Sequence, residues 1–319
     1  MIKNLVGNKI KILAIVGPTA TGKSALAVWI AKKINAEIIS ADSMQVYKYM
    51  DIATAKITKE EQCGVVHHIM SFLNVNEEFS VADYVEMANK TILQIVEKGK
   101  NIVLVGGTGL YIDSLLNGIY FQKEYKSDSL RNILQNMADE KGFSYMYEKL
   151  KEIDPIYSKK VHINNKKKIL RCFETFILTG KNVTDNIKLN NSSKRPFSCL
   201  KIGLNFKDRL KLYENINIRV DRMFEKGLLQ EARNIFLMNC SKTAMQAIGY
   251  KELFLYFSGE ITLNEAIENI KRNTRRYAKR QITWFKRDEA IKWFFLDEKE
   301  CCNIKIEILK LAENFIQSN

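Results

Sequence analysis

The sequence has no long apolar run, few histidines and no cysteine pair of the C-x-x-C type. Because it lacks a stretch of about 18 apolar residues, no membrane-spanning helix is predicted. Its six cysteines include one adjacent pair, Cys301 and Cys302, a pattern that favours reduced cytoplasmic thiols over a disulfide framework or a zinc site. With only three histidines in the chain, His67 and His68 are interpreted as packed or hydrogen-bonded side chains, not metal ligands.

Acidic residues are scarce in the second half of the chain. Residues 1–150 carry 17 Lys and Arg against 16 Asp and Glu, whereas residues 151–319 carry 33 against 20. This asymmetry suggests a nucleic-acid partner for the second half, since the net charge of +14 arises almost entirely there. A Lys-rich composition with solvated faces would give the same total, so local patterning has to separate the two interpretations.

The strongest local basic feature is the segment 271–287, which holds eight Lys and Arg and no Asp or Glu. Apolar side chains recur at helical spacing along it, so one helix face packs and the other presents cations. A solvated helix face normally mixes both signs, and this pattern therefore favours contacts with a phosphate backbone. The candidate nucleic-acid-binding residues of this segment are Arg272, Arg275, Arg276, Lys279 and Arg280.

One phosphate-binding motif stands near the N-terminus. Residues 17–24 match G-x-x-x-x-G-K-[ST], after an apolar run at 12–16 and before a helical pattern at 24–34. The glycines let backbone N–H groups turn inward, the helix start adds a positive dipole end, and Lys23 adds a full charge. The loop is predicted to hold a di- or triphosphate, without indicating which. Its residues are Gly17, Pro18, Thr19, Ala20, Thr21, Gly22, Lys23 and Ser24.

Strand and helix patterns alternate around this loop. Apolar runs at 12–16, 37–40 and 102–105 are typical of buried parallel strands, with helical patterns at 24–34 and 81–97 between them. The alternation predicts an α/β fold, a P-loop NTPase-like doubly wound parallel sheet. Because ligands bind beyond the carboxyl ends of such strands, the polar segments that follow the strands should converge on one edge of the sheet.

The middle of the chain breaks this alternation. Residues 115–195 show helical patterns without a strong strand signal, which predicts a helical insertion domain closed by a polar loop at 190–196. Residues 1–114 and 196–319 are then expected to form the α/β core. In its second part, strands are predicted at 199–206 and 292–296, and helices at 209–237, 245–257, 263–287 and the C-terminus.

Two strand ends carry candidate catalytic groups. Asp42 follows the second predicted strand, where a carboxylate can serve as a general base. Asp42 with Gln45 also fits a capping box, so a purely structural role as a helix cap is an equal alternative. The third strand ends in glycines and Thr108, where nucleoside triphosphatases usually place an Asp that holds Mg²⁺, which counts against an ATPase. Thr108 either offers a hydroxyl to a ligand or marks a plain turn.

These motifs form an ordered series that resembles the tRNA dimethylallyltransferases, the bacterial tRNA isopentenyltransferase family. The series runs over residues 12–287, nearly the whole chain, and its order makes the resemblance specific. The matching segments are 17–24, 42–47 (DSMQVY), 51–56 (DIATAK), 67–68 with 79–84 (HH and FSVADY), 106–111 (GGTGLY), 246–252 (QAIGYKE) and 274–285 (TRRYAKRQITWF).

The resemblance implies transfer of a dimethylallyl group from dimethylallyl diphosphate to N6 of the adenosine 3′-adjacent to the anticodon in tRNA. It assigns the phosphate loop to the diphosphate of the donor, with Mg²⁺ held through that diphosphate and by Ser24. Asp42 is the implied base, and Lys23 and Arg219 are implied to neutralise the leaving diphosphate. Thr108 corresponds to a threonine that contacts the target nucleotide.

The resemblance also implies wider contacts with the tRNA anticodon stem-loop. The implied contact residues are Asp42, Ser43, Met44, Gln45 and Thr108 in the core, and Arg131, Lys167, Lys168 and Arg171 in the insertion. Lys168 departs from the family pattern, in which Arg is expected. We expect a cytoplasmic monomer without membrane contact. Three alternatives stay open: a nucleotide kinase, an enzyme that prenylates free adenine nucleotides, and a nucleic-acid-binding module that uses nucleotide as a switch.

Overall fold

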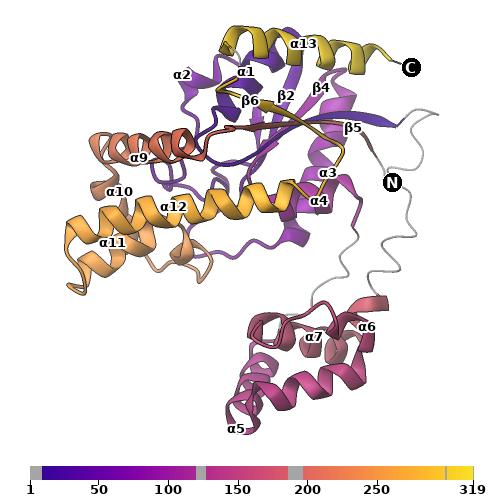
Figure 1. Ribbon diagram of the computed structural model, residues 1–319, viewed down its shortest axis with the longest axis vertical. Coiled ribbons are helices and arrows are strands. Elements are labelled where there is room, and N and C mark those ends of the chain that lie inside the picture. Colours follow the sequence, from indigo (N-terminus) through magenta and orange to yellow (C-terminus); the bar gives the residue numbers. More distant parts are fainter. Residues whose placement is uncertain (1–8, 120–126, 186–196, 299, 319) are drawn as a thin grey trace. The chain divides into compact units, whose positions relative to one another are not determined.

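The computed structural model describes residues 9–119, 127–185, 197–298 and 300–318. The polar loop predicted at 190–196 lies outside the described residues. The chain divides into two compact units, one made of Met1–Asn117 with Pro196–Asn319 and the other of Gly118–Arg195 (Figure 1).

The larger unit is built on one six-stranded parallel sheet with the order β3-β2-β4-β1-β5-β6. The α/β class predicted from the sequence is therefore confirmed. In the centre of the sheet, Ala14 pairs with Leu104 on one side and with Lys201 on the other. The strands are β1 (Ile10–Val16), β2 (Ala36–Ala41), β3 (His67–His68), β4 (Asn101–Gly106), β5 (Phe197–Asn205) and β6 (Ile291–Phe295). The short strand β3 was not predicted, because two residues show no periodicity.

Helices cover both faces of this sheet (Figure 1). On one face, α1 (Lys23–Lys33) and α13 (Cys301–Gln317) bury apolar side chains against alternate residues of the strands, such as Leu13 and Ile15. On the other face, α3 (Val81–Glu97) and α4 (Gly109–Leu116) contact β4. The short helix α2 (Lys59–Gln62) lies between β2 and β3 in the chain. This layering leaves the carboxyl ends of the strands free to form a site.

Two helices that the sequence predicts as continuous in the second part of the core are each divided in the structure, so these two predictions are wrong. The stretch 209–237 is split into α9 (Arg209–Glu225) and α10 (Leu228–Phe236) by Gly227, which has a φ of 94°. The stretch 245–257 is a 3₁₀ turn, η2 (Ala244–Gln246), followed by α11 (Tyr250–Phe257), with Gly249 at a φ of 101° between them. A left-handed backbone at glycine ends a helix even where the apolar spacing continues. The long basic helix is α12 (Leu263–Phe285).

The regular secondary structure in the described residues of the smaller unit is entirely helical. Its helices are α5 (Asp128–Ile153), α6 (Pro155–Ser158) and α7 (Lys166–Thr179), and α5 is interrupted at Gly142. A small core packs α5 against α7 through side chains that include Leu134, Met146, Leu150 and Ile169. Helix α4 ends at Leu116, and the α/β unit extends to Asn117. None of the helices in the described part of the chain has both the length and the apolar character needed to cross a membrane.

Candidate active site

The phosphate loop joins β1 to α1 through two glycines with positive φ angles. Gly17 has a φ of 134°, and a Cβ atom at this position would lie 2.2 Å from the carbonyl oxygen of Leu204. Gly22 has a φ of 72° and precedes α1 without a side-chain cap. Because glycine has no side chain that could cap α1, the N–H groups of the first helical turn can bind an anion at the helix N-terminus.

A cavity of about 280 Å³ lies beside this loop, at the carboxyl ends of β1, β2 and β4. The loop contributes Thr19, Lys23 and Ser24 to its wall, Asp42 follows β2, and Arg219 comes from α9. The expected convergence of the segments that follow the strands is thereby confirmed. The wall also includes residues 43–45, 53–55, 105–107 and 246–249 and several residues of α12.

Two desolvated cations, Lys23 and Arg219, and the carboxylate of Asp42 influence one another in this cavity. Burial and the neighbouring Arg219 charge together lower the pKa of the Lys23 ammonium to about 7, against the opposing effect of the Asp42 carboxylate. Burial likewise lowers the pKa of Arg219, with Asp42 again opposing. The Lys23 ammonium donates to the carbonyl of Pro18 in its own loop. Because two desolvated cations face each other, the cavity favours a multiply charged anion.

The structure excludes one of the two sequence interpretations of Asp42. No helix follows it, so the capping-box alternative is wrong. Its Oδ1 accepts a hydrogen bond of 2.9 Å from the backbone N–H of Met44, which closes a local turn. Gln45, the other half of the supposed box, donates instead to the carbonyl of Thr54 at 3.2 Å. The turn holds the carboxylate on the cavity wall, where it also contributes to the raised pKa of the buried Tyr277.

Thr108 is brought to the same edge by a hydrogen bond between two strand ends. Its Oγ1 accepts from the backbone N–H of Ser43 at 3.0 Å and so ties the β4 turn to the turn that contains Asp42. The neighbouring glycines are required by close packing. A Cβ atom would lie 2.1 Å from the Gln281 side chain at Gly107 and 2.2 Å from the Trp284 ring at Gly109. The glycines therefore make room for side chains of α12. The sequence alone leaves open whether this segment contacts a ligand or forms a plain turn.

Gln281 is a site residue that sequence reasoning missed. Its Oε1 accepts from the N–H of Thr19 at 2.9 Å, and its Nε2 donates to the carbonyl of Gly107 at 3.0 Å. One buried amide side chain thus joins the phosphate loop to the β4 turn. The signal in the sequence is its place among apolar residues, because a polar residue on the packed face of α12 needs a hydrogen-bond partner.

We expect Gln281→Ala to lower the free energy of unfolding by about 1–3 kcal/mol, because it leaves a buried backbone donor and acceptor without partners. Equilibrium unfolding in urea measures the change. The matched control is Gln230→Ala, which removes an exposed glutamine of α10 whose amide donates to Asn234. A Gln281→Ala protein as stable as this control would contradict the bridging role.

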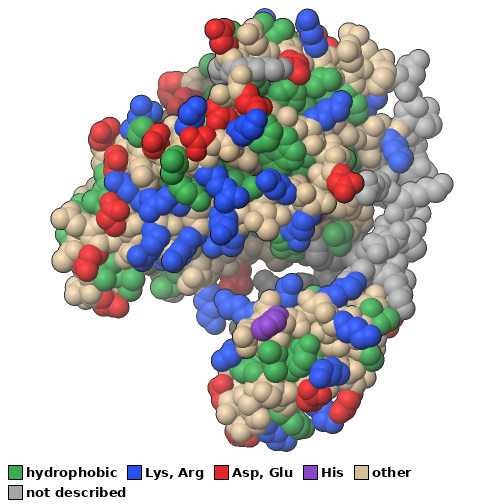
Figure 2. All heavy atoms as spheres, viewed as in Figure 1, with side chains coloured by type: hydrophobic (Ala, Val, Ile, Leu, Met, Phe, Trp, Pro, Cys, Tyr) green, Lys and Arg blue, Asp and Glu red, His purple; other side chains and the backbone are tan. Residues whose placement is uncertain are grey.

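The predicted cationic face lies on α12, and Figure 2 shows Lys and Arg side chains gathered along this helix. Arg280 lines the cavity, and Arg275 donates to the side chain of Asn217 at 2.6 Å. Arg272 donates to Asn269, three residues earlier on the same helix. The remaining two predicted contact residues, Arg276 and Lys279, are exposed and have no ion pair or side-chain hydrogen bond with any described residue.

The basic residues predicted in the insertion are arranged around a buried acid. Arg131 of α5 and Arg171 of α7 both pair with Glu174, each at 2.7 Å. Glu174 is 4 % exposed at its side chain, whereas the two arginines are 43 % and 39 % exposed. The Arg131 pair therefore joins α5 to α7, the Arg171 pair lies within α7, and both arginines still present part of the guanidinium to solvent. Lys167 and Lys168, at the start of α7, are exposed.

The two adjacent histidines form the edge strand β3, and both are hydrogen-bonded. His67 Nδ1 contacts the carbonyl of Val65 at 2.9 Å, and His68 Nε2 lies 2.7 Å from the buried carboxylate of Glu37. Burial alone would raise the pKa of Glu37, but hydrogen bonds from His68, Lys100 and Lys98 lower it to about 2. His68 therefore helps to satisfy a buried charge, and both histidines are hydrogen-bonded, in agreement with the hydrogen-bonding interpretation.

Comparison with known proteins gives a consistent assignment. The sequence model of the IPP transferase family matches residues 45–288. A tRNA dimethylallyltransferase of Caldanaerobacter subterraneus subsp. tengcongensis is 51% identical over 292 residues, which cover 91% of this chain and 93% of that protein. The tRNA dimethylallyltransferase of Clostridioides difficile is 44% identical over 315 residues, 97% of this chain and 99% of that protein.

Solved structures agree. The tRNA isopentenylpyrophosphate transferase of Bacillus halodurans superposes with a TM-score of 0.73 at 39% identity and covers 97% of both chains. A eukaryotic dimethylallyltransferase described as acting on tRNA superposes with a TM-score of 0.81 at 28% identity, over 96% of this chain and 79% of that one. The identities, the coverage and the ordered motifs lead to one conclusion: this chain is a transferase that belongs to the tRNA dimethylallyltransferase family.

Proposed function

We propose that this chain transfers the dimethylallyl group of dimethylallyl diphosphate to N6 of the adenosine directly 3′ of the anticodon in tRNA. The observation that carries the proposal is that the phosphate loop and Asp42 line one cavity, so a bound diphosphate and a candidate base face the same space. Nucleotide phosphorylation is less well supported, because β4 is followed by Gly107 and Thr108 and not by a carboxylate.

The donor diphosphate is proposed to bind at the phosphate loop. The N–H groups at the start of α1, the Lys23 ammonium and the Arg219 guanidinium would neutralise the charge that grows on the leaving diphosphate. The wall of the same cavity includes apolar side chains, among them Met223 and Ile270, which suit a branched hydrocarbon group. A cavity that combines cations beside the phosphate loop with apolar side chains suits an isoprenoid diphosphate.

The acceptor adenosine is proposed to enter beside Asp42. As the lone pair of N6 forms a bond to the allylic carbon, the bond between that carbon and the diphosphate oxygen breaks, and diphosphate leaves. The proton lost from N6 passes to the Asp42 carboxylate. Thr108, Ser43, Met44 and Gln45 would position the base, since they share the turn or border on it. The adenine must leave its stack to reach the cavity, which costs least in a loop that is already single-stranded.

Magnesium is proposed to act together with the donor. Within the described residues, no group of three or more His, Cys, Asp or Glu side chains is arranged to hold a metal ion. The Ser24 hydroxyl beside Lys23 offers one oxygen ligand, which fits Mg²⁺ because this ion keeps waters and phosphate oxygens as its other ligands. The bound ion would add positive charge at the leaving diphosphate.

The tRNA backbone is proposed to contact the cationic face of α12, and the insertion through Arg131, Lys167, Lys168 and Arg171. The partnerless cations of α12 support the first contact, because a protein surface seldom gathers exposed charges of one sign without an anionic ligand. We also propose a monomer that acts on tRNA in the cytoplasm. Sedimentation velocity tests the monomer.

Replacing Arg276 and Lys279 together by Ala should weaken tRNA binding and lower the slope of log Kd against log salt by about 1.5 to 2. The slope falls because binding releases fewer counterions when fewer phosphate contacts form. Filter binding over a salt series measures the slope. The matched control replaces Lys32 and Lys33, exposed at the end of α1, by Ala. An unchanged slope in the Arg276 and Lys279 variant would contradict tRNA binding by this face.

A transfer assay tests the function. The folded protein, Mg²⁺ and labelled dimethylallyl diphosphate should label an anticodon stem-loop that contains adenosine at the target position, and should not label the same stem-loop with guanosine there. AMP as acceptor distinguishes an enzyme of free nucleotides, and ATP consumption with a nucleoside monophosphate distinguishes a kinase. The proposal fails if the stem-loop stays unlabelled.

A further inference from the structure

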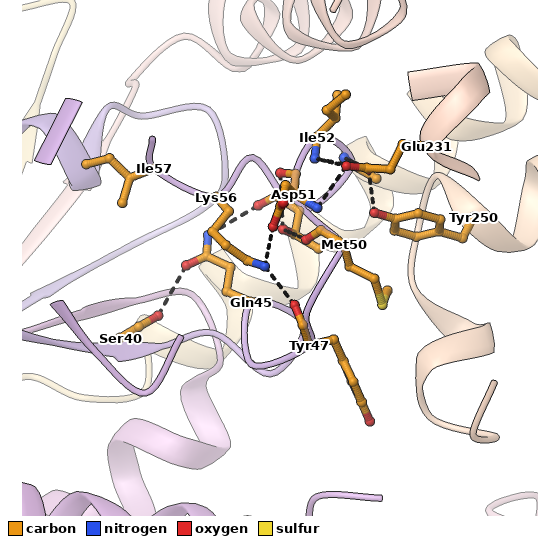
Figure 3. Close-up of polar contacts among 12 residues, drawn as sticks. Ser40, Gln45, Tyr47, Met50, Asp51, Ile52, Lys56, Ile57, Glu231 and Tyr250 are labelled. Atoms are coloured by element: carbon orange, nitrogen blue, oxygen red, sulfur yellow. Dashed lines mark hydrogen bonds and ion pairs between the residues drawn. The ribbon is translucent and has the colours of Figure 1, made fainter. Parts of the chain in front are cut away.

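The carboxylate of Glu231 on α10 is enclosed by backbone N–H groups of a loop far away in the sequence (Figure 3). It accepts from the N–H groups of Asp51 at 3.0 Å, Ile52 at 2.9 Å and Ala53 at 3.2 Å. The hydroxyl of Tyr250 on α11 donates to the same carboxylate at 2.6 Å. Successive amides around one anion commonly bind a phosphate or carboxylate ligand, and here the chain supplies the anion itself.

The side chains of Tyr250 and Lys56 add hydrogen bonds to this arrangement. Burial and the neighbouring Glu231 charge raise the pKa of the Tyr250 hydroxyl, so it remains a hydrogen-bond donor at any physiological pH. The Lys56 ammonium donates to the carbonyl of Tyr47 at 2.7 Å and pairs with the Asp51 carboxylate at 2.5 Å (Figure 3). The loop is thus held at both ends by charged hydrogen bonds, which are stronger than neutral ones.

The loop that Glu231 holds is part of the cavity wall. Ala53, Thr54 and Ala55 line the cavity that contains the phosphate loop, and Ala55 together with Arg219 also lines a neighbouring cavity of about 500 Å³. Glu231 lines neither cavity. Its carboxylate therefore contacts the wall from behind and is not placed to touch a ligand in either space.

The α11 side of the wall fits the same loop tightly. Gly249 has a φ of 101°, and a Cβ atom there would lie 2.8 Å from the Cβ atom of Ala53. Gly249 also caps α11, because its N–H donates to the Glu252 carboxylate at 2.8 Å. Ala53 is thus fixed between the Glu231 carboxylate and the Gly249 backbone, and loss of the carboxylate releases it on one side.

We propose that Glu231 is a positioning residue for the prenyl donor, which holds residues 51–55 where their side chains close the cavity beside Lys23 and Arg219. The proposal rests on the proposed function, because the donor it concerns is dimethylallyl diphosphate. Without the carboxylate, three adjacent N–H groups lose their common acceptor and the loop has to turn them towards water. The apolar wall then moves relative to the two cations, and donor affinity falls.

We expect Glu231→Ala to raise the Kd and the KM for dimethylallyl diphosphate about tenfold or more, while kcat and the Kd for tRNA change by less than about threefold. Glu231→Gln should raise the donor Kd and KM less. Its amide oxygen still accepts from the N–H groups of the loop, whereas its NH₂ group cannot accept from them. Isothermal titration with the unreactive thiodiphosphate analogue of the donor measures Kd, and thermal unfolding checks each variant.

Two comparisons make the test specific. Gln230→Ala changes the neighbouring exposed position of α10 and should keep the parental KM. Tyr250→Phe removes one hydroxyl and keeps all three amide contacts, so its KM should rise less than about threefold. The proposal is overturned if folded Glu231→Ala and Glu231→Gln bind the donor as tightly as the parent. It is equally overturned if Tyr250→Phe matches the Glu231→Ala effect, or if donor affinity, kcat and tRNA affinity all fall together.

The same experiment separates this inference from the function on which it rests. A parental protein that binds the donor analogue but transfers nothing to the stem-loop refutes the proposed function. A parental protein that transfers the group, with Glu231 variants of parental donor affinity, refutes only the positioning role.

Discussion

Replacing Asp42 with Asn should lower the rate of prenyl transfer about 100-fold or more and leave donor binding intact. The amide has the same shape as the carboxyl group and can still accept the 2.9 Å hydrogen bond from the Met44 backbone N–H, so the turn should persist. It cannot take the proton that N6 of adenosine must lose. Single-turnover transfer of labelled dimethylallyl group to a stem-loop measures the chemical step, and calorimetry with the donor analogue measures binding.

The matched control is Asp208→Asn. Asp208 caps α9 by accepting from the N–H of Leu210 at 2.8 Å, and Asn caps a helix equally well, so the parental rate should be kept. If Asp42→Asn also transferred at the parental rate, Asp42 would do no more than close its turn, and the base would have to be sought elsewhere in the cavity.

Replacing Lys23 with Met should reduce kcat/KM for the donor about 100-fold, because a charge aimed at the leaving diphosphate is lost from a shielded site. The Met side chain keeps a similar length and apolar stem. It also removes a charge that burial disfavours, so the variant should not unfold more easily than the parent at about pH 6, where the parental lysine is charged. Steady-state kinetics and thermal unfolding measure the two effects.

The pH dependence of donor binding gives the same residue a second test. The pKa of Lys23 in the free protein is about 7, and a bound diphosphate favours the charged form. Binding above this pH must therefore take up a proton, so the donor Kd should rise towards about tenfold per pH unit between about pH 7.5 and 9, where the diphosphate itself is fully ionised. Below about pH 7 no proton is taken up by Lys23, and this contribution vanishes.

Lys23→Met should abolish that pH dependence, since no group with this pKa remains beside the diphosphate. Lys32→Met changes an exposed lysine at the other end of α1 and should keep the parental profile. A parental Kd that stays flat over this range, or a Lys23→Met variant that keeps the slope, would show that the titration belongs to another group.

The parts of the site that follow strands could be predicted from the sequence. The G-x-x-x-x-G-K-[ST] pattern, the carboxylate at Asp42 and the glycines around Thr108 each come directly after an apolar run, and parallel strands bring their carboxyl ends to one edge. Local spacing is sufficient for this inference because it needs only the fold class. The same reasoning could not decide whether Asp42 caps a helix, because the backbone after it forms a turn that the capping pattern does not exclude.

The residues that join distant segments could not be predicted in this way. Gln281 meets the phosphate loop across 262 positions, and Glu231 meets residues 51–53 across about 180 positions. Periodicity places each on a helix but does not name its partner. The pairing of Arg131 with Glu174 likewise depends on how α5 packs against α7. Such contacts follow from tertiary packing, which a single sequence does not reveal.

The central claim is that one cavity holds the isoprenoid diphosphate on the phosphate loop with Asp42 beside the acceptor amine. A crystal structure of the protein with the thiodiphosphate analogue of the donor and an anticodon stem-loop tests it most directly. The account predicts the diphosphate against residues 17–24 and Arg219, with N6 of the target adenosine within hydrogen-bonding distance of the Asp42 carboxylate. A diphosphate bound away from the phosphate loop, or a target adenine that approaches from a side remote from Asp42, would contradict it.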